Sequence, residues 1–325
     1  MQTVRWGIMG LGKIARRFAE DLSLTTDNQL VAVASRTREN AQQFAKQYGA
    51  KYWFDQFEAL ACCPEVDIVY IATPHTDHYP LTLLALQQGK HVLCEKPMGI
   101  NAKEVVAMQQ LAAEKRLFLM EALWTRYMPS YQVMLEWLPQ IGIIKQLRAD
   151  FGFAARVSQE HRLMNKAKGG GALLDIGIYP VFLALQVLGI PENISATATL
   201  LSSGIDAACQ IDFDYPQQGA KALLTCTILQ DTASEAVVIG ENGNIHMAKP
   251  WHSWGAVTLQ LTGKPPLTFT PEKRGNGLWL ETNAAAQAIR TGKLEEPLMP
   301  HAVSLQIAHV LDAIRGQIGL RYSQD

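Results

Sequence analysis

The first 124 residues alternate between two hydrophobic periods, and this alternation restricts the fold more than any other feature of the sequence. Short apolar runs rich in Val, Ile and Ala occur at 3–10, 29–35, 66–74, 90–97 and 117–124. Between them stand longer segments with apolar positions at helical spacing, at 13–22, 39–49, 79–89 and 101–116. Near-continuous apolar strands separated by helices are typical of a parallel sheet covered by helices on both faces.

The pattern changes after about residue 121. One helix is expected near 127–138, and strand-like stretches follow at 143–155, 193–203, 206–215, 219–231, 234–240 and 256–262. Successive strands without intervening helices indicate a mostly antiparallel sheet. We therefore expect an α/β domain over residues 1–121 and an α+β domain with a large, open-faced sheet over residues 122–325. Because its strands are apolar at both alternating positions, we expect the open face to be apolar and to need a partner.

Composition and charge exclude several classes of protein. The net charge of −1 creates no global field that would recruit nucleic acid or an anionic membrane. We expect no basic leader and no apolar run close to the roughly 18 residues that a membrane span requires. The cysteines are odd in number and lack metal-type spacing, which indicates a reducing compartment: they are Cys62, Cys63, Cys94, Cys209 and Cys226. We expect a cytoplasmic protein.

The turn after the first apolar run contains the pattern GxGxxA, with Gly10, Gly12 and Ala15 at its three fixed positions. Glycines at such a turn let backbone amides approach a pyrophosphate, which then lies over the start of the next helix. A purely structural turn is the alternative interpretation. The surrounding strand and helix favour a dinucleotide site made by Gly10, Leu11, Gly12, Lys13 and Ile14.

The end of the second strand reads Ser35, Arg36, Thr37, Arg38. An NAD site usually has an Asp or Glu there, which binds the 2′-hydroxyl of the ribose, and this chain has neither. A hydroxyl beside two guanidinium groups suits a 2′-phosphate instead. We therefore predict NADP as the cofactor, with NAD as the alternative, although Arg36 and Arg38 could also be solvated loop charges.

Three further segments carry a resemblance to a known family. They read "IATPHTDHYPLTLLALQQGKHVLCEKPMGINAKE" (71–104), "MEALWTRYMPSY" (120–131) and "GGGALLDIGIYPV" (169–181). The first is similar to the glucose–fructose oxidoreductase/inositol dehydrogenase/MocA family. The other two resemble its subgroup of dimeric dihydrodiol dehydrogenases and NADP-dependent D-xylose dehydrogenases. The resemblance implies an N-terminal Rossmann domain, a C-terminal substrate domain and association as a homodimer or a dimer of dimers.

The resemblance also assigns roles to the "EKP" triplet at residues 95–97. It implies that the triplet ends a sheet strand and faces the nicotinamide, often with a cis Lys–Pro bond. Lys96 would then be a fixed cation beside the reacting carbon, Pro97 would set its direction, and Glu95 would contact the cofactor. The alternative interpretation is that these charged residues are only the polar end of a strand.

The segment "DIGIY" places Asp175 and Tyr179 four residues apart, so they share one face if the segment is helical. Many family members have a His where Tyr179 stands and an Asp where Phe182 stands, and this departure favours the dihydrodiol/xylose subgroup. We expect Tyr179 to transfer a proton, with a phenol pKa lowered by a nearby ammonium. An ordinary core tyrosine is the alternative. Asp175 would orient a substrate hydroxyl or Lys96.

Other candidates come from loops and aromatic positions. We interpret Thr73, Pro74, His75 and His78 as cofactor-loop residues, although the two histidines could also be polar groups at a helix start. A metal site is disfavoured because no third ligand is near in sequence. The resemblance places Trp124 and Arg126 near the nicotinamide and substrate. Aromatic side chains could form an apolar wall for a sugar or diol, although they could equally be core: Phe153, Trp251, Trp254 and Trp279.

These features together predict an NADP(H)-dependent oxidoreductase. Tyr179 would take the hydroxyl proton from a secondary alcohol or hemiacetal while hydride moves to the nicotinamide, and Lys96 would stabilise the developing oxyanion. The substrate would be a small molecule: a sugar, a diol or a dicarbonyl. The alternatives are a non-catalytic regulator that senses nicotinamide cofactor and a reductase of another substrate class, such as biliverdin reductase.

Overall fold

The computed structural model describes residues 3–325, and the chain divides into two compact units. The first unit comprises Met1–Trp124 and Lys273–Leu305, and the second comprises Thr125–Glu272 and Gln306–Asp325. The first crossing therefore lies three residues beyond the boundary expected from sequence. The expected second domain also loses the segment 273–305, which returns to the first unit. We describe each unit by itself.

The first unit contains a six-stranded parallel sheet in the order β3-β2-β1-β4-β5-β6. Its strands are β1 (Val4–Met9), β2 (Asn28–Ala34), β3 (Tyr52–Phe54), β4 (Ile68–Ile71), β5 (His91–Glu95) and β6 (Leu119–Ala122). Its helices are α1 (Lys13–Leu22), α2 (Arg38–Tyr48), α3 (Phe57–Ala61), α4 (His75–Gln87), α5 (Ala102–Lys115) and α8 (Leu278–Arg290). This strand order confirms the expected Rossmann domain.

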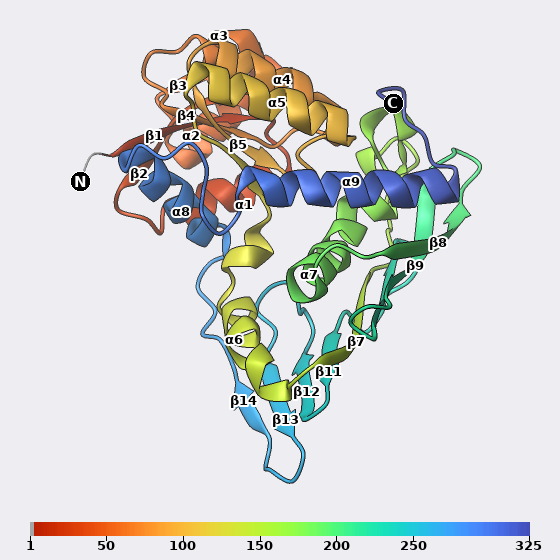
Figure 1. The fold of residues 1–325 in the computed structure, drawn as a ribbon. Coiled ribbons are helices and arrows are strands. Elements are labelled where there is room, and N and C mark those ends of the chain that lie inside the picture. Colours follow the sequence, from red (N-terminus) through yellow and green to blue (C-terminus); the bar gives the residue numbers. More distant parts are fainter. Residues whose placement is uncertain (1–2) are drawn as a thin grey trace. The chain divides into compact units, whose positions relative to one another are not determined.

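Helices cover both faces of this sheet, with α1, α2 and α8 on one side and α3, α4 and α5 on the other (Figure 1). The central strands β1, β4 and β5 are therefore almost entirely buried, which explains why most of their residues are apolar. The strand order reverses between β1 and β4. In open α/β sheets, ligands bind at the carboxyl ends of the strands beside such a reversal.

The return segment is fixed to the first unit by specific hydrogen bonds. The backbone N–H of Leu278, at the start of α8, donates to Asp21 Oδ2 of α1 at 2.7 Å. A ring nitrogen of His301 lies 2.9 Å from the carbonyl oxygen of Leu119 in β6. Helix α9 (His301–Ile318) contains the last change of unit, between Leu305 and Gln306. These contacts join residues about 180 or more positions apart, so local sequence patterns could not predict them.

The second unit contains an eight-stranded, mostly antiparallel sheet in the order β14-β13-β12-β11-β7-β10-β9-β8. The strands are β7 (Ile144–Gly152), β8 (Asn193–Leu200), β9 (Asp206–Tyr215), β10 (Ala220–Thr227), β11 (Ala236–Gly240), β12 (Gly243–Met247), β13 (Val257–Leu261) and β14 (Leu267–Phe269). Only β7 and β10 pair in parallel. The helical elements are 3₁₀ turns at Leu138–Ile141, Arg162–Met164 and Lys166–Lys168, α6 (Pro129–Trp137), a π-helical turn (Leu173–Gly177) and α7 (Ile178–Leu188). A further 3₁₀ turn, Trp124–Tyr127, spans the change from the first unit to the second.

The open face of this sheet is more polar than the sequence suggested. In β9 and β10 the apolar residues at alternate positions are buried, while Gln210, Asp212 and Lys221 on the other face are exposed. Leu223 is half-buried among them. The expectation of an apolar open face was therefore wrong, because period-two alternation directs most of the apolar side chains to the other face. Association as a homodimer or a dimer of dimers stays a prediction.

The most apolar helical stretch of the chain belongs to the core of the second unit. Residues 166–188 have a window of mean hydropathy 1.8, long and apolar enough for a membrane span by composition alone. That window is 89% buried inside the protein. The expectation that no run approaches this length was wrong, but burial on this scale is typical of a core helix.

Candidate active site

The turn between β1 and α1 contains two glycines in different surroundings. Gly10 has a φ of +89°, and a Cβ there would lie 2.7 Å from Thr73 Cγ2 and 2.9 Å from the carbonyl oxygen of Ala72. A Cβ on Gly12 would have no atom of residues 3–325 within 4 Å. Protein packing therefore demands glycine at position 10, whereas the space at position 12 is open to a ligand.

Helix α1 begins at this open space. Gly12 is its N-cap residue, no side chain of the described residues caps it, and its first turn contains no acidic residue. Its first amide groups are thus available to an anion, which the partial positive charge of a helix N-terminus also favours. A glycine with open space above an uncapped helix fits the pyrophosphate of a dinucleotide.

Ser35, Arg36 and Arg38 follow the end of β2, next to this turn in the sheet order. The Ser35 hydroxyl accepts a hydrogen bond of 3.1 Å from the Asn40 side chain and is buried. Arg36 and Arg38 are exposed, and the Arg38 guanidinium lies 5.1 Å from the centre of the Trp53 ring. Stacking on Trp53 limits the motion of Arg38 while leaving its N–H groups free to bind a phosphate.

His78 joins the loop after β4 to the turn after β5. Its ring nitrogens lie 2.7 Å from the carbonyl oxygen of Pro97 and 3.0 Å from that of Thr73. Both contacts are hydrogen bonds only when both ring nitrogens carry a proton. His78 is buried, so the structure gives it a supporting position between two predicted cofactor loops. His75 is buried one helical turn before it.

The Lys96–Pro97 peptide bond is cis, as the resemblance implied. Lys96 is half-buried at the carboxyl end of β5. Glu95 before it is buried and accepts a hydrogen bond from the Tyr70 hydroxyl, and the Tyr70 ring stacks on Phe18 at 3.9 Å. Glu95 thus contacts the β4 side of the sheet, and its predicted contact with the cofactor stays a prediction.

Asp175 and Tyr179 lie on the helical segment that begins at the π-helical turn. The backbone N–H of Leu173, the first residue of this turn, donates to Asp206 Oδ2 at 2.5 Å. Asp175 is buried and forms an ion pair of 3.0 Å with Arg162, a residue that sequence reasoning missed. No local signal marks Arg162, because it lies thirteen positions earlier, in a separate 3₁₀ turn.

Tyr179 packs in a cluster of aromatic rings within the second unit. The His252 ring stacks on Phe151 at 4.1 Å between centroids and lies 5.2 Å from the Tyr179 ring. The Phe151 and Tyr179 rings are 5.6 Å apart. His252 was missed by sequence reasoning. Its only signal was its place between Trp251 and Trp254, and nothing local connects it with residue 179.

The remaining predicted residues fall into separate groups. Phe153 neighbours Phe151 at 6.5 Å, which places it beside the Tyr179 cluster. Trp251 is buried and donates to the carbonyl oxygen of Asp150, as a core residue does. The indole N–H of Trp254 is buried and has no acceptor among residues 3–325.

Trp124, Arg126 and Trp279 lie elsewhere. Trp279 belongs to the first unit, where it packs under Arg274 at 4.9 Å. Trp124 ends the first segment of the first unit. Arg126 stands in the second unit, with its guanidinium 5.7 Å from the Tyr131 ring. Among the described residues, no group of three or more His, Cys, Asp or Glu could hold a metal ion.

Comparison with known proteins places both parts of the chain in one family. Residues 4–123 match the family described as oxidoreductase family, NAD-binding Rossmann fold, and residues 139–246 match the GFO/IDH/MocA C-terminal domain. The trans-1,2-dihydrobenzene-1,2-diol dehydrogenase of Danio rerio is 36% identical over 99% of both chains. The Homo sapiens enzyme of that name is 34% identical over the same share.

Solved structures give the same result. KijD10, a 3-ketoreductase from Actinomadura kijaniata, is 25% identical over 98% of both chains, and its complex with NADP and TDP-benzene superimposes with a TM-score of 0.88. The aldose-aldose oxidoreductase of Caulobacter crescentus is 26% identical over 97% of both chains, with a TM-score of 0.87. The chain therefore belongs to the GFO/IDH/MocA family and is an NAD(P)-dependent oxidoreductase.

Proposed function

We propose that the protein transfers hydride between NADP(H) and the secondary alcohol or hemiacetal carbon of a sugar or trans-dihydrodiol-like substrate. The observation that carries this proposal is that Lys96 and Tyr179 each stand on a segment held by buried hydrogen bonds. Full-length relatives named as dihydrodiol dehydrogenases and a ketoreductase crystallised with NADP support it.

In the proposed mechanism, one side chain transfers a proton and another stabilises negative charge. A bound nicotinamide would supply the hydride acceptor for oxidation, or the donor for reduction. Tyr179 takes the proton from the carbinol oxygen during oxidation and returns it during reduction. Lys96 places an ammonium beside that oxygen and stabilises the negative charge that develops there. The proposal thus requires that one substrate carbinol contacts both side chains.

Asp175 is assigned a positioning role. Its ion pair with Arg162 fixes the carboxylate four residues before Tyr179 on the same helical segment. A carboxylate has about four acceptor positions on its two oxygens, so it can accept from Arg162 and from a substrate hydroxyl at the same time. This arrangement suits a polyhydroxylated substrate.

The aromatic cluster favours substrates that present an apolar face. The rings of Phe151 and His252 lie beside the Tyr179 ring, and Phe153 neighbours Phe151. Sugar rings and dihydrodiols both combine such a face with hydroxyl groups at the edge. The unpaired indole N–H of Trp254 offers one hydrogen bond to a substrate oxygen.

A spectrophotometric screen tests the proposed function. NADP⁺ and NADPH, each with a panel of aldoses, trans-dihydrodiols and α-dicarbonyls, should give a change at 340 nm with at least one class. Tight coenzyme binding without turnover on any class would favour the non-catalytic sensor instead. Absence of coenzyme binding would overturn the proposal.

The choice of coenzyme makes a separate prediction. Arg38→Ala should lower kcat/KM with NADP⁺ by about 10- to 100-fold, as expected for the loss of one charge-assisted phosphate contact. Activity with NAD⁺, which lacks the 2′-phosphate, should change less than about twofold. Arg17→Ala, which removes an exposed guanidinium from α1, is the matched control and should leave both values unchanged. An equal loss with both coenzymes would contradict the assignment.

A further inference from the structure

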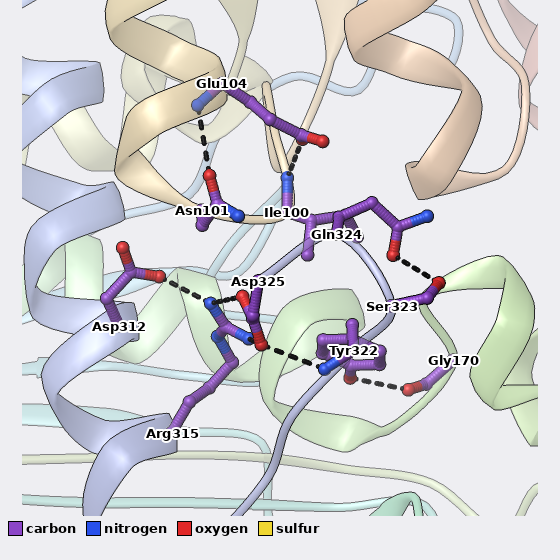
Figure 2. A network of polar contacts seen from close by, with 10 residues as sticks. All are labelled: Ile100, Asn101, Glu104, Gly170, Asp312, Arg315, Tyr322, Ser323, Gln324 and Asp325. Atoms are coloured by element: carbon purple, nitrogen blue, oxygen red, sulfur yellow. Dashed lines mark hydrogen bonds and ion pairs between the residues drawn. The ribbon is translucent and has the colours of Figure 1, made fainter.

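The turn that follows Lys96 is held by two buried carboxyl groups. The backbone N–H of Met98 donates to Glu121 Oε1 at 2.8 Å, and that of Ile100 donates to Glu104 Oε2 at 2.7 Å. Figure 2 shows the second of these contacts, together with the 3.0 Å hydrogen bond from the Glu104 N–H to the Asn101 side chain. Residues 97–102 are all buried. The Lys96 backbone is therefore fixed from its C-terminal side.

Glu121 differs from Glu104 in its surroundings. It lies in the middle of β6, is 2% exposed and pairs with Cys94 of β5 in the sheet register. Helix α5 supplies Glu104, which closes the turn at its far end. Burial raises the pKa of Glu121 to about 7. The charge of Glu95 raises it too, whereas the Ser304 hydroxyl, the Met98 amide and the Lys96 ammonium lower it.

A purely structural role would not require a carboxylate at position 121. A neutral amide oxygen would accept the Met98 hydrogen bond equally well, and a fully buried carboxylate costs several kcal/mol of desolvation. What the charge adds is electrostatic: it acts on Lys96, whose ammonium is one of the groups that lower the pKa of Glu121. The charge also strengthens the hydrogen bond from the Met98 amide, because a carboxylate is a stronger acceptor than a neutral oxygen.

We propose that Glu121 is a positioning residue for Lys96, fixing the turn through the Met98 amide with a hydrogen bond that its negative charge strengthens. This inference rests on the proposed function, in which Lys96 contacts the substrate oxygen. It adds a buried residue of β6 that never touches the substrate.

The kinetic test is the pH dependence of kcat in Glu121→Gln. Glutamine keeps an acceptor for Met98 and imitates the protonated carboxyl, so the variant and the wild type should converge below pH 6. At pH 8.5 the kcat of the wild type should be about tenfold higher than that of the variant. The rise in kcat that the wild type shows around pH 7 should be absent from the variant. Glu104→Gln, the matched control, should keep the rise in kcat around pH 7. A constant ratio of the two rates at all pH values would overturn the proposal.

A second measurement does not depend on turnover. In protein labelled with ¹³C at the glutamate carboxyl, the Glu121 signal is assigned by its loss in Glu121→Gln. It should titrate near pH 7 and move to higher pH in Lys96→Met. Lys103→Met, an exposed lysine of α5, should leave it unchanged.

The two measurements separate the inference from the proposed function. If the pH at which Glu121 titrates is the same in Lys96→Met as in the wild type, the inference is overturned even in an active enzyme. A coupled titration in a protein that turns over no substrate would instead refute the proposed function and leave the Glu121–Lys96 coupling standing.

Discussion

At the scale of single residues, the two glycines after β1 are glycine for different reasons. Gly10 has a positive φ and a Cβ would collide with the backbone of Ala72, so the fold itself excludes a side chain. Gly12 has an ordinary negative φ and open space around it among the described residues. We attribute its lack of a side chain to the proposed dinucleotide site, and alanine variants at the two positions test this assignment.

We predict opposite outcomes for two alanine variants. Gly12→Ala should keep the melting temperature of the wild type within about 2 °C but weaken NADPH binding at least tenfold, because the methyl group fills the space for the pyrophosphate. Gly10→Ala should lower the melting temperature instead, since it introduces backbone strain and a collision. Fluorescence titration with NADPH and thermal unfolding measure the two effects. Unchanged NADPH affinity in a folded Gly12→Ala protein would contradict the site.

Sequence reasoning found the residues that belong to local motifs and missed those that act through space. The glycines, Lys96 and Tyr179 belong to short sequence motifs, so a few neighbouring residues are enough to predict their roles. Arg162 and His252 do not, because their partners lie 13 and 73 positions away. Glu121 was part of a quoted motif, but only the fold shows that its carboxyl accepts the Met98 amide.

At the scale of elements, long periodic segments were predicted well and short ones were not. Helix α1 and strand β9 have the predicted bounds, 13–22 and 206–215. Strands β3 and β14 have three residues each, too few to show a period, and were missed. Helix α4 begins at His75, four residues before the predicted residue 79, and Pro80 lies inside the helix.

The π-helical turn before α7 was not predictable from its letters. The apolar residues of "ALLDIGIY" fit an α-helix equally well, and the wider turn becomes visible only in the structure. Asp206, which is 0% exposed, binds the N–H of the first residue of this turn. A buried carboxyl on β9 thereby fixes the start of the segment that carries Tyr179.

This element has a predictable pH dependence. Burial raises the pKa of Asp206 to about 6, although the Leu173 amide opposes the rise. The folded state therefore prefers the protonated carboxyl, so its contribution to stability is complete below about pH 4 and is lost as the pH rises through 6. Relative to the wild type, Asp206→Asn should gain up to about 3 kcal/mol of unfolding free energy between pH 4 and pH 7.

Urea denaturation at several pH values measures this difference. Asp212→Asn, an exposed position on the same strand, is the control and should follow the wild type throughout. If the Asp206→Asn and wild-type stabilities stay parallel from pH 4 to pH 7, then Asp206 does not carry the raised pKa.

At the scale of the whole molecule, the chain crosses between its two units three times. A linear reading of the sequence suggests one boundary near 121, because the change from βα to successive strands is visible there. It cannot show that 273–305 returns to the first unit, since that segment looks like any helical stretch. The return has a functional consequence in our account, because Ser304 on this segment is one of the groups that set the pKa of Glu121.

The proposed mechanism requires that Lys96 and Tyr179 act together on one substrate carbinol. The most direct test is a double-mutant cycle on kcat/KM with Lys96→Met, Tyr179→Phe and the double variant, with coenzyme binding checked by fluorescence. Each single variant should lose about 10²- to 10⁴-fold, and the double variant should be little worse than the poorer single one, since residues that act as a unit are not additive. Losses that simply multiply, or full activity in either single variant, would contradict the account.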